Sequence, residues 1–313
     1  MVSLTGRSRV DLLRGPTIVH EMIGLRDALG GGPRLSVKRD DAIPFGFGGN
    51  KVRKLEFVLR DALDAGADTI VTVGGIQSNH ARATAAAAVK FGMRCTIIAN
   101  GTRPEKPTAN ALLNVLLGAD LVYIPSRHER AEALRTVMAQ LVADGRRPFA
   151  IPLGASTSVG ALGFVAAIDE LARQGDLPDV IVHATSSGGT QAGLVAGLTL
   201  RGATTRVIGI SADDPAVSVA STVREIVRGI DGLGEFSSPI EVDDAWVGGG
   251  YGVPTDSSRE AQTLLARTEG IFVDHTYTAK AMAALIARVR SGEFSDNENV
   301  LFWHTGGQVG LFA

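Results

Sequence analysis

Residues 69–91 read TIVTVGGIQSNHARATAAAAVKF. The first five form a nearly continuous apolar run, the pattern of a strand buried on both faces in a parallel sheet. Two glycines follow, and the small and apolar residues from Asn79 to Phe91 indicate a helix. A strand that passes through glycines into a helix is typical of an α/β fold, where ligands bind beyond the carboxyl ends of parallel strands.

The same alternation continues on both sides of this segment. It predicts parallel strands joined by right-handed crossovers. The predicted strands are 35–38, 69–73, 95–99, 120–124, 179–184, 206–211 and 299–304. The predicted helices are 54–65, 79–91, 109–117, 159–173, 189–201, 216–230, 257–269 and 279–290. We expect two sheets, one within about residues 52–160 and one built from the rest.

The composition is that of a globular enzyme rather than a nucleic-acid or membrane protein. The 313 residues are 45% hydrophobic and 20% charged, with a formal net charge of -2, and they leave room for two domains. This balance gives no basic surface for nucleic acid. The longest apolar stretches fall short of the roughly 18 residues that a membrane-spanning helix needs. Because segment 1–12 also lacks the apolar region of a signal peptide, we expect a soluble cytoplasmic protein.

The sequence offers neither disulfide nor metal chemistry. Its single cysteine, Cys95, lies in a predicted buried strand without an activating neighbour, so we expect a small core residue. The six histidines are scattered and have no second ligand at the spacing of a metal site. We therefore predict no metal ion.

Lys51 ends the segment Gly48-Gly49-Asn50-Lys51. A lysine after paired glycines at a loop-to-helix junction approaches a ligand closely. Lysine forms a Schiff base with a carbonyl group when its pKa is depressed or the product is stabilised. Taken alone, the segment fits a solvated lysine in the first turn of a helix as well.

Residues 185–193 read TSSGGTQAG, between a predicted strand and a predicted helix. Glycines let backbone N–H groups turn toward an anion, while the helix N-terminus and the hydroxyls add favourable charge and donors. The pattern predicts a phosphate site, although a tight packing turn would use the same glycines. It matches neither a Walker loop nor the dinucleotide fingerprint, so we expect no nicotinamide oxidoreductase.

Three further segments place polar side chains beside predicted strand ends or in loops. The residues concerned are Ser78, Asn79, His80, Thr305, Tyr251 and Tyr277. The first three follow the strand at 69–73, and the two tyrosines lie in loops of a chain with only three tyrosines. For each segment alone, an N-cap or another structural role is an alternative explanation.

Taken in order, these motifs resemble the fold-type II pyridoxal-phosphate enzymes. Within them the resemblance is to the branch of D-cysteine desulfhydrase, L-cysteate sulfo-lyase and 1-aminocyclopropane-1-carboxylate (ACC) deaminase. It covers nearly the whole chain, and its most specific part is GGNKxRKLE from Gly48 combined with GGxxSNH from Gly74. The resemblance implies a tryptophan synthase β-like fold with two domains, each an open, mostly parallel sheet flanked by helices. The implied large cofactor-binding domain comprises residues 1–51 and 161–313, and the implied small mobile domain comprises residues 52–160.

The resemblance also implies the cofactor, pyridoxal 5'-phosphate, and a role for each motif residue. Lys51 is implied to carry the cofactor and to move the α-proton. Thr305 is implied to face the pyridine nitrogen, where a hydroxyl leaves that nitrogen largely unprotonated and so favours elimination. The implied cofactor-binding residues are Asn50, Lys51, Asn79, Ser187, Gly188, Gly189, Thr190 and Thr305. The implied substrate-binding residues are Ser78, Asn79, His80, Tyr251 and Tyr277, and the implied catalytic residues are Lys51, Ser78, Tyr251 and Tyr277.

The implied reaction is β-elimination from a small amino acid, which gives pyruvate, ammonia and the leaving group, and the implied assembly is a homodimer. ACC deaminases usually have glutamate after the second tyrosine and glutamine after Ser-Asn, where this chain has Thr278 and His80. Ring opening is therefore the alternative. Racemisation and β-replacement on the same scaffold stay open, and a non-catalytic pyridoxal-phosphate binding protein is least favoured. The runs at 248–250 and 306–310 also depart from the relatives, which leaves the identity and chirality of the substrate open.

Overall fold

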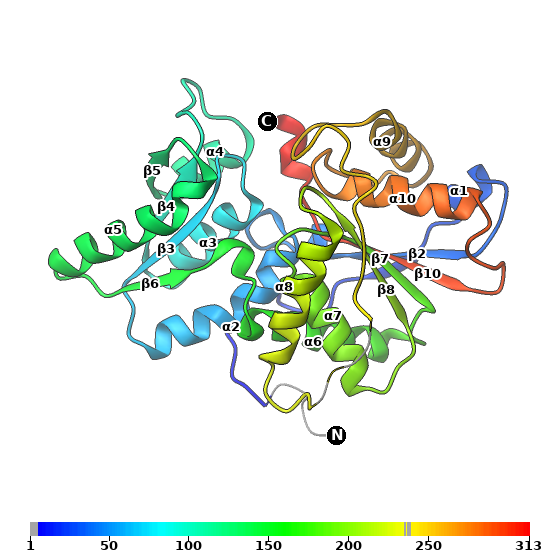
Figure 1. The fold of residues 1–313 in the computed structure, drawn as a ribbon, viewed down its shortest axis with the longest axis horizontal. Helices are drawn as coiled ribbons and strands as arrows, with labels where there is room; N and C mark the ends of the chain where they lie inside the picture. The colour runs from blue at the N-terminus through cyan, green and yellow to red at the C-terminus, as the bar shows by residue number, and fades with distance from the viewer. Residues whose placement is uncertain (1–5, 235, 237–238) are drawn as a thin grey trace.

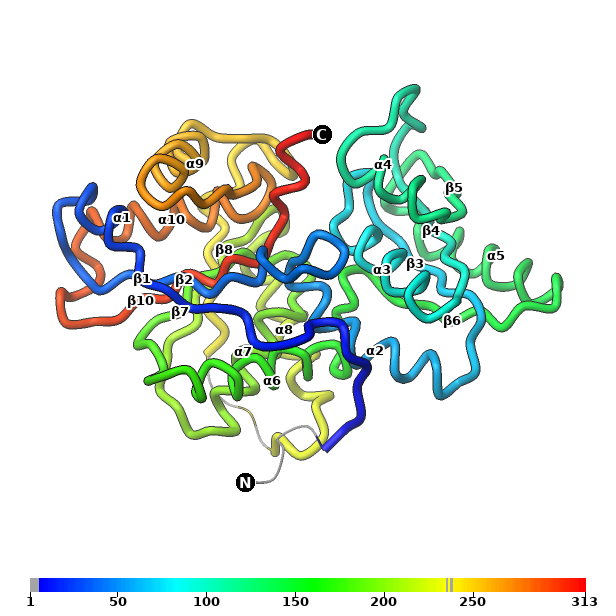
Figure 2. The backbone as a smooth tube through the Cα atoms, turned by 180° about the vertical axis from the view of Figure 1, so that it is seen from behind, coloured from blue at the N-terminus to red at the C-terminus, as the bar shows by residue number. Residues whose placement is uncertain are grey.

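The computed structural model describes residues 6–234, 236 and 239–313; residues 1–5 of the N-terminal segment and residues 235, 237 and 238 lie outside the described residues. The described chain forms two sheets flanked by helices, which lie side by side in Figures 1 and 2. The predicted α/β class with parallel sheets is confirmed.

The larger sheet has six strands in the order β1-β2-β10-β7-β8-β9. β1 is antiparallel to β2, and every other neighbouring pair is parallel. The central strands β7 and β10 are buried along nearly their whole length, which explains their continuous apolar sequences. The strands are β1 (Val19–Glu21), β2 (Arg34–Arg39), β7 (Val180–Thr185), β8 (Arg206–Ser211), β9 (Glu241–Asp243) and β10 (Asn299–His304).

The smaller sheet has four parallel strands in the order β5-β4-β3-β6. They are β3 (Thr69–Gly75), β4 (Arg94–Asn100), β5 (Asp120–Ile124) and β6 (Pro148–Ile151). All four come from residues 69–151, inside the range that the sequence suggested for one sheet. The division of the whole chain into domains at residues 51, 52, 160 and 161 stays a prediction.

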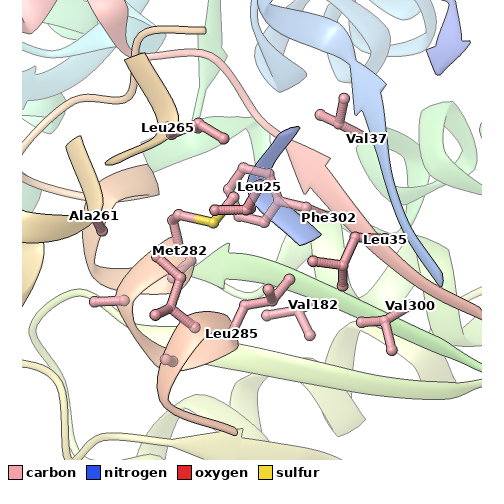
Figure 3. Packing of buried hydrophobic residues seen from close by; sticks show 14 of the residues in the cluster. Leu25, Leu35, Val37, Val182, Ala261, Leu265, Met282, Leu285, Val300 and Phe302 are labelled. Carbon is pink, nitrogen blue, oxygen red and sulfur yellow. The ribbon is translucent and has the colours of Figure 1, made fainter. Parts of the chain in front are cut away.

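Helices cover both faces of the larger sheet. One face packs against α1 (Ile23–Ala28), α9 (Asp256–Glu269) and α10 (Thr278–Arg290). Figure 3 shows Met282 and Leu285 of α10 lying against Val182 and Phe302 of the sheet. The other face packs against α6 (Ser158–Gln174) and α7 (Gly189–Leu200), and α8 (Ala216–Arg228) packs outside them. Burial on both faces fixes the positions of the strand ends, where the site forms.

The smaller sheet is covered by α2 (Asn50–Asp64) and α3 (Asn79–Lys90) on one face and by α5 (Arg130–Ala143) on the other. The short α4 (Ala109–Leu116) packs against α3. The alanines of α3 are all buried, because small side chains let this helix approach the sheet closely. This close packing fixes the loop between β3 and α3 above the strand ends.

Several short or weakly patterned elements are not predictable from the sequence. β1 and β9 have three residues each and β6 has four, which is too short for a periodic signal. α5 was not predicted either, although its partly buried apolar residues Leu134, Val137 and Leu141 lie at helical spacing and pack on the smaller sheet. α2 begins at Asn50, before the predicted start at 54, which places Lys51 in its first turn. The structure also contains the 3-10 helices η1 (Asp40–Ala42), η2 (Phe45–Phe47), η3 (Arg127–Glu129), η4 (Leu153–Ala155) and η5 (Gln308–Phe312).

The structure also describes the single cysteine, the possible metal ligands and the lengths of the apolar helices. Cys95 is buried in β4, and burial raises the pKa of its thiol to about 12, so it stays protonated in the core. Among the residues described, no group of three or more histidine, cysteine, aspartate or glutamate side chains is placed to hold a metal ion. Nor does the described chain contain a helix both long and apolar enough to cross a membrane.

A buried cluster of charges ties the start of α2 to the larger sheet. Arg53 donates to Asp40 at 2.9 Å and to Glu170 at 2.9 Å. Lys38 of β2 also donates to Glu170, and the indole N–H of Trp303 donates to Asp40 at 2.8 Å. Because every charge here has a partner of opposite sign, the cluster holds the first turn of α2 at a fixed place beside β10.

Candidate active site

A cavity of about 350 Å³ lies at the carboxyl ends of the parallel strands and is lined by residues that follow strands of both sheets. Of the twelve site residues predicted from the sequence, all but Gly189 line it. Gly189 begins α7 directly beside this lining. Residues that are far apart in the sequence therefore meet here, as the predicted site requires.

Lys51 lies beside the end of β10. The backbone N–H of Asn50 donates to the carbonyl of Thr305 at 2.9 Å, and the side chains of Thr305 and Lys51 line the same cavity. The two segments approach so closely that a Cβ on Gly306 would lie 2.6 Å from the Cα of Gly49, so only glycine fits there. Burial lowers the pKa of Lys51 to about 8, with no compensating charge or hydrogen bond. A neutral amine is the form of lysine that attacks a carbonyl group.

The glycine-rich segment after β7 forms a concave turn at the N-terminus of α7. Gly188 has φ 77°, a left-handed conformation that favours glycine and turns the backbone toward the cavity. Asn50 donates through Nδ2 to the hydroxyl of Thr190 at 2.9 Å, which joins this turn to α2. The buried hydroxyl of Thr185 has no hydrogen-bond partner among the described residues. Free donors at a helix N-terminus match a phosphate group.

Lys54 of α2 lies behind this turn and was missed by sequence reasoning. Its Nζ donates to the carbonyl of Gly154 at 3.0 Å and to Ser156 Oγ at 3.1 Å. Ser156 in turn lies 2.8 Å from the hydroxyl of Ser187. Burial and the neighbouring Lys51 lower the pKa of Lys54 well below its usual value, so a bound phosphate would be what keeps this amine charged. The one available signal was its spacing of three from Lys51, which places both on one helix face.

The loop after β3 places Ser78 and Asn79 at the N-terminus of α3. Ser78 Oγ accepts from the N–H of Ala81 at 3.2 Å, so Ser78 is the N-cap that the sequence offered as an alternative, while also lining the cavity. The first N–H groups of α3 have no partner within the helix and suit a carboxylate. Asn110 donates to Asn79 Oδ1 at 2.9 Å, which leaves the Nδ2 of Asn79 as the donor at the cavity.

His80 is buried in the wall of the cavity. Its Nε2 lies 2.9 Å from the hydroxyl of Thr72 in β3. Burial, followed by the nearby Lys51 and Lys54, lowers the pKa of His80 well below its usual value. The ring is therefore neutral, and its hydrogen bond to β3 holds the loop that carries Ser78.

Tyr251 and Tyr277 meet through their hydroxyl groups, which hydrogen-bond to each other. Their rings are in an edge-to-face arrangement with centroids 5.7 Å apart. The buried Lys280 of α10 donates to the carbonyls of Val247 and Gly250 at 2.8 and 2.9 Å and so fixes the loop that carries Tyr251. Burial raises the pKa of both phenols, so both carry a proton at neutral pH. The pair therefore presents protonated hydroxyls to the cavity.

A charged group at the cavity mouth was also missed from the sequence. Arg127 donates to Asp213 at 2.6 Å and to Asp214 at 3.2 Å, which follow β8. Arg130, at the start of α5, lines the cavity and donates through Nε to Asn100 Oδ1 at 2.9 Å. These arginines lie in a segment without a recognised motif, and only the fold brings them to the site.

The chain belongs to the family described as pyridoxal-phosphate dependent enzyme, whose model matches residues 10–306. It is 38% identical to the D-cysteine desulfhydrase of Salmonella newport over 321 residues, which cover 99% of this chain and 97% of that protein. The D-cysteine desulfhydrase of Salmonella heidelberg matches equally well.

Solved structures agree with this family. A crystal structure of an ACC deaminase homologue superposes with a TM-score of 0.91 at 33% identity and covers 99% of this chain and 95% of its own. A threonine deaminase isoform 2 from Solanum lycopersicum superposes with a TM-score of 0.68 at 17% identity, covering 93% and 79%. At that identity it shares the fold alone. The tryptophan synthase β-like class predicted from the sequence is thereby confirmed, as is pyridoxal phosphate as the cofactor.

The residues of the cavity fit this cofactor. The turn at Ser187–Thr190, with the unpartnered hydroxyl of Thr185 and the amine of Lys54 behind it, would hold the phosphate. Lys51 would hold the aldehyde carbon, and the free Nδ2 of Asn79 matches the phenolic oxygen. Bound there, the cofactor supplies an electron sink next to the substrate's α-carbon.

Proposed function

We propose that this enzyme breaks the bond between the β-carbon and a sulfur substituent of a small amino acid, as a D-cysteine desulfhydrase does. For cysteine the balanced reaction consumes water and gives pyruvate, ammonia and hydrogen sulfide. The observation that carries the proposal is that a free, half-buried Lys51 and a protonated tyrosine pair line the same cavity. This cavity occurs in a chain 38% identical to D-cysteine desulfhydrase over its full length.

The cavity offers a separate group for each part of the substrate. The N-terminus of α3, with Ser78, would receive the α-carboxylate, because its first N–H groups have no partner within the helix. The Nζ of Lys51, in its neutral form, would accept the α-proton of the substrate. General-base help of this kind contributes about 10²–10⁴-fold to a rate. Tyr277, hydrogen-bonded to Tyr251, would donate its proton to the departing sulfur.

The test is to add D-cysteine, L-cysteine, L-cysteate and ACC separately to the holoenzyme and to assay keto acids and the released sulfur species. We expect pyruvate together with sulfide or sulfite from at least one sulfur amino acid. The variant Lys51→Ala should release none. Pyruvate production by the Lys51→Ala variant at the wild-type rate would contradict the proposal.

ACC deaminase is a second candidate, because an ACC deaminase homologue superposes on 99% of this chain. Residue 278 disfavours it. The hydroxyl of Thr278 donates to Asp274 at 2.7 Å, and this buried side chain is absent from the cavity lining. The position after the second tyrosine thus supplies no acid to the substrate. Release of α-ketobutyrate from ACC would favour this second function.

Racemisation and β-replacement use the same lysine and cofactor. Racemisation would introduce solvent deuterium at the α-carbon without pyruvate, and β-replacement would need a second nucleophile. The protonated tyrosine pair favours elimination, since it supplies a proton where a leaving group departs. The keto-acid assay therefore separates these reactions.

We also propose that the enzyme is a cytoplasmic homodimer in which residues 52–160 move as a unit to close over the substrate. The ion pair of Arg127 with Asp213 and Asp214 supports closure, because it joins a residue of that range to the loop after β8 across the cavity mouth. Light scattering in solution would measure the mass of the assembly. Small-angle scattering with and without substrate would measure closure.

A further inference from the structure

Arg130 is a cation in the cavity that the proposed reaction does not use. Its Nε and Nη2 both donate to one neutral acceptor, Asn100 Oδ1. In the described part of the chain it forms no ion pair. The neighbouring carboxylates of Asp213 and Asp214 are instead held by Arg127. Arg130 therefore keeps an uncompensated charge beside the substrate space.

The position of Arg130 is unfavourable for protein stability. It is the first residue of α5, a helix of 14 residues, where the helix dipole disfavours a positive charge. Burial and the neighbouring Arg127 both lower its pKa, which means that its charged form is poorly solvated. We expect a poorly solvated cation in this position to bind an anionic group of the substrate.

The other anionic groups, the cofactor's phosphate and the substrate's α-carboxylate, already have partners in the cavity. The phosphate fits the turn at 187–190 with Lys54 behind it, and the α-carboxylate fits the N-terminus of α3. Arg130 lines the same cavity as Tyr251 and Tyr277, where the leaving group would depart, and both phenols also act on its pKa. A second acidic group on the substrate would lie there.

We propose that Arg130 binds an anionic substituent on the β-carbon, so that the preferred substrate is an amino acid with a β-sulfonate rather than a neutral thiol. This inference rests on the proposed function and names its substrate class. For a sulfonate, the Cα–H and Cβ–S bonds break and the sulfur leaves with the bonding electron pair as sulfite. One water is consumed, and pyruvate, ammonium and hydrogensulfite are the products. Arg130 stabilises the charge that develops on the sulfite.

The experiment compares the holoenzyme with Arg130→Gln on two pairs of substrates. D- and L-cysteate carry the sulfonate, and D- and L-cysteine carry the neutral thiol. For the wild type we expect a higher kcat/KM with one cysteate enantiomer than with either cysteine. Arg130→Gln should lose about tenfold or more in kcat/KM for that cysteate, the effect of one charge-assisted contact, and change less than about twofold for cysteine. Dissociation constants from the change in cofactor absorbance give a second readout, independent of turnover.

Two further variants control for charge and folding. Arg135→Gln removes the same charge from an exposed position of the same helix and should behave as the wild type. Arg130→Lys keeps the charge but loses the planar guanidinium, so it should retain more cysteate activity than Arg130→Gln. If Arg130→Gln fails to fold, Arg130→Lys provides the comparison between cysteate and cysteine instead, because it changes the side chain less.

The outcomes separate this inference from the proposed function. Equal losses for cysteate and cysteine would overturn it, because Arg130 would then bind the shared α-carboxylate. Pyruvate from cysteine with neither binding nor turnover of cysteate would also overturn it and leave the elimination proposal standing. If cysteate binds through Arg130 but no amino acid yields a keto acid, the anion site stands and the proposed function falls.

Discussion

Lys51 and Lys54 lie on one face of α2, and their amines differ in the hydrogen bonds that they make. The Nζ of Lys54 is held by a carbonyl and a hydroxyl, whereas Lys51 is shifted by burial alone. An ordinary lysine at pH 8 is neutral in fewer than about 1% of molecules, whereas Lys51, with a pKa of about 8, is half neutral. Burial lowers the pKa of Lys54 too, but its Nζ is engaged by Gly154 and Ser156, so we propose Lys51 as the nucleophile.

This difference predicts how the cofactor-free enzyme takes up its cofactor. Because the neutral amine is the reactive form, the rate of uptake should rise with pH and reach half its maximum near about pH 8. Stopped-flow absorbance between pH 6 and 10 would measure it. A midpoint near 10.5, the ordinary lysine value, would show that Lys51 is not desolvated.

The tyrosine pair predicts a loss of turnover when one hydroxyl is removed. Tyr277→Phe should lower kcat by about a hundredfold or more with little change in cofactor binding, because it removes the proton donor for the leaving group. Tyr123→Phe is the matched control, since Tyr123 is the third tyrosine and lies outside the cavity lining. An unchanged kcat in Tyr277→Phe would exclude Tyr277 as the donor.

At the scale of elements, the N-termini of α2, α3 and α7 converge on one cavity. The sequence predicted the strand-to-helix junctions before α3 and α7, because apolar runs, glycines and caps are local signals, but it placed the start of α2 four residues too late. It could not predict Lys54, Asn110 or Arg130, whose roles depend on which elements lie side by side. Arg130 is the clearest case, since it begins a helix that the sequence prediction omitted, and its place beside Asn100 at the cavity depends on the fold.

The turn at α7 predicts a role for Lys54 in cofactor affinity. Lys54→Met keeps the length of the side chain and removes the charge behind the phosphate cradle. The dissociation constant of the cofactor should rise about tenfold or more, as for a charge-assisted hydrogen bond. Equilibrium dialysis would measure it, with Lys90→Met at an exposed position as control. Wild-type affinity in Lys54→Met would show that the cradle binds phosphate without this amine.

At the scale of the whole molecule, the buried cluster around Arg53 joins α2, which carries Lys51, to the larger sheet. Burial opposes ionisation of Glu170, but Arg53 and Lys38 outweigh it and lower the pKa of Glu170 from 4.5 to about 2. A lowered carboxyl pKa contributes stability that is fully present above 4.5 and is lost as pH falls toward about 2. The position of Lys51 therefore depends on a cluster that acid disrupts.

Glu170→Gln tests this dependence. It leaves Arg53 and Lys38 with fewer anionic partners, and breaking such a buried pair costs roughly 3–5 kcal/mol of unfolding free energy. The difference from wild type should be largest above about pH 5 and should shrink as pH falls toward 2, where Glu170 itself becomes neutral. Urea unfolding at several pH values would measure it. A difference that does not vary with pH would assign the loss to packing instead.

The central claim is that Lys51, and not its neighbour Lys54, carries the cofactor. Borohydride reduction of the holoenzyme fixes the cofactor to its lysine, and peptide mass spectrometry then locates it. The account predicts that the added mass lies on Lys51 and is absent from Lys54, whose amine is held by Gly154 and Ser156. Attachment to Lys54, or to a lysine outside the cavity, would contradict it.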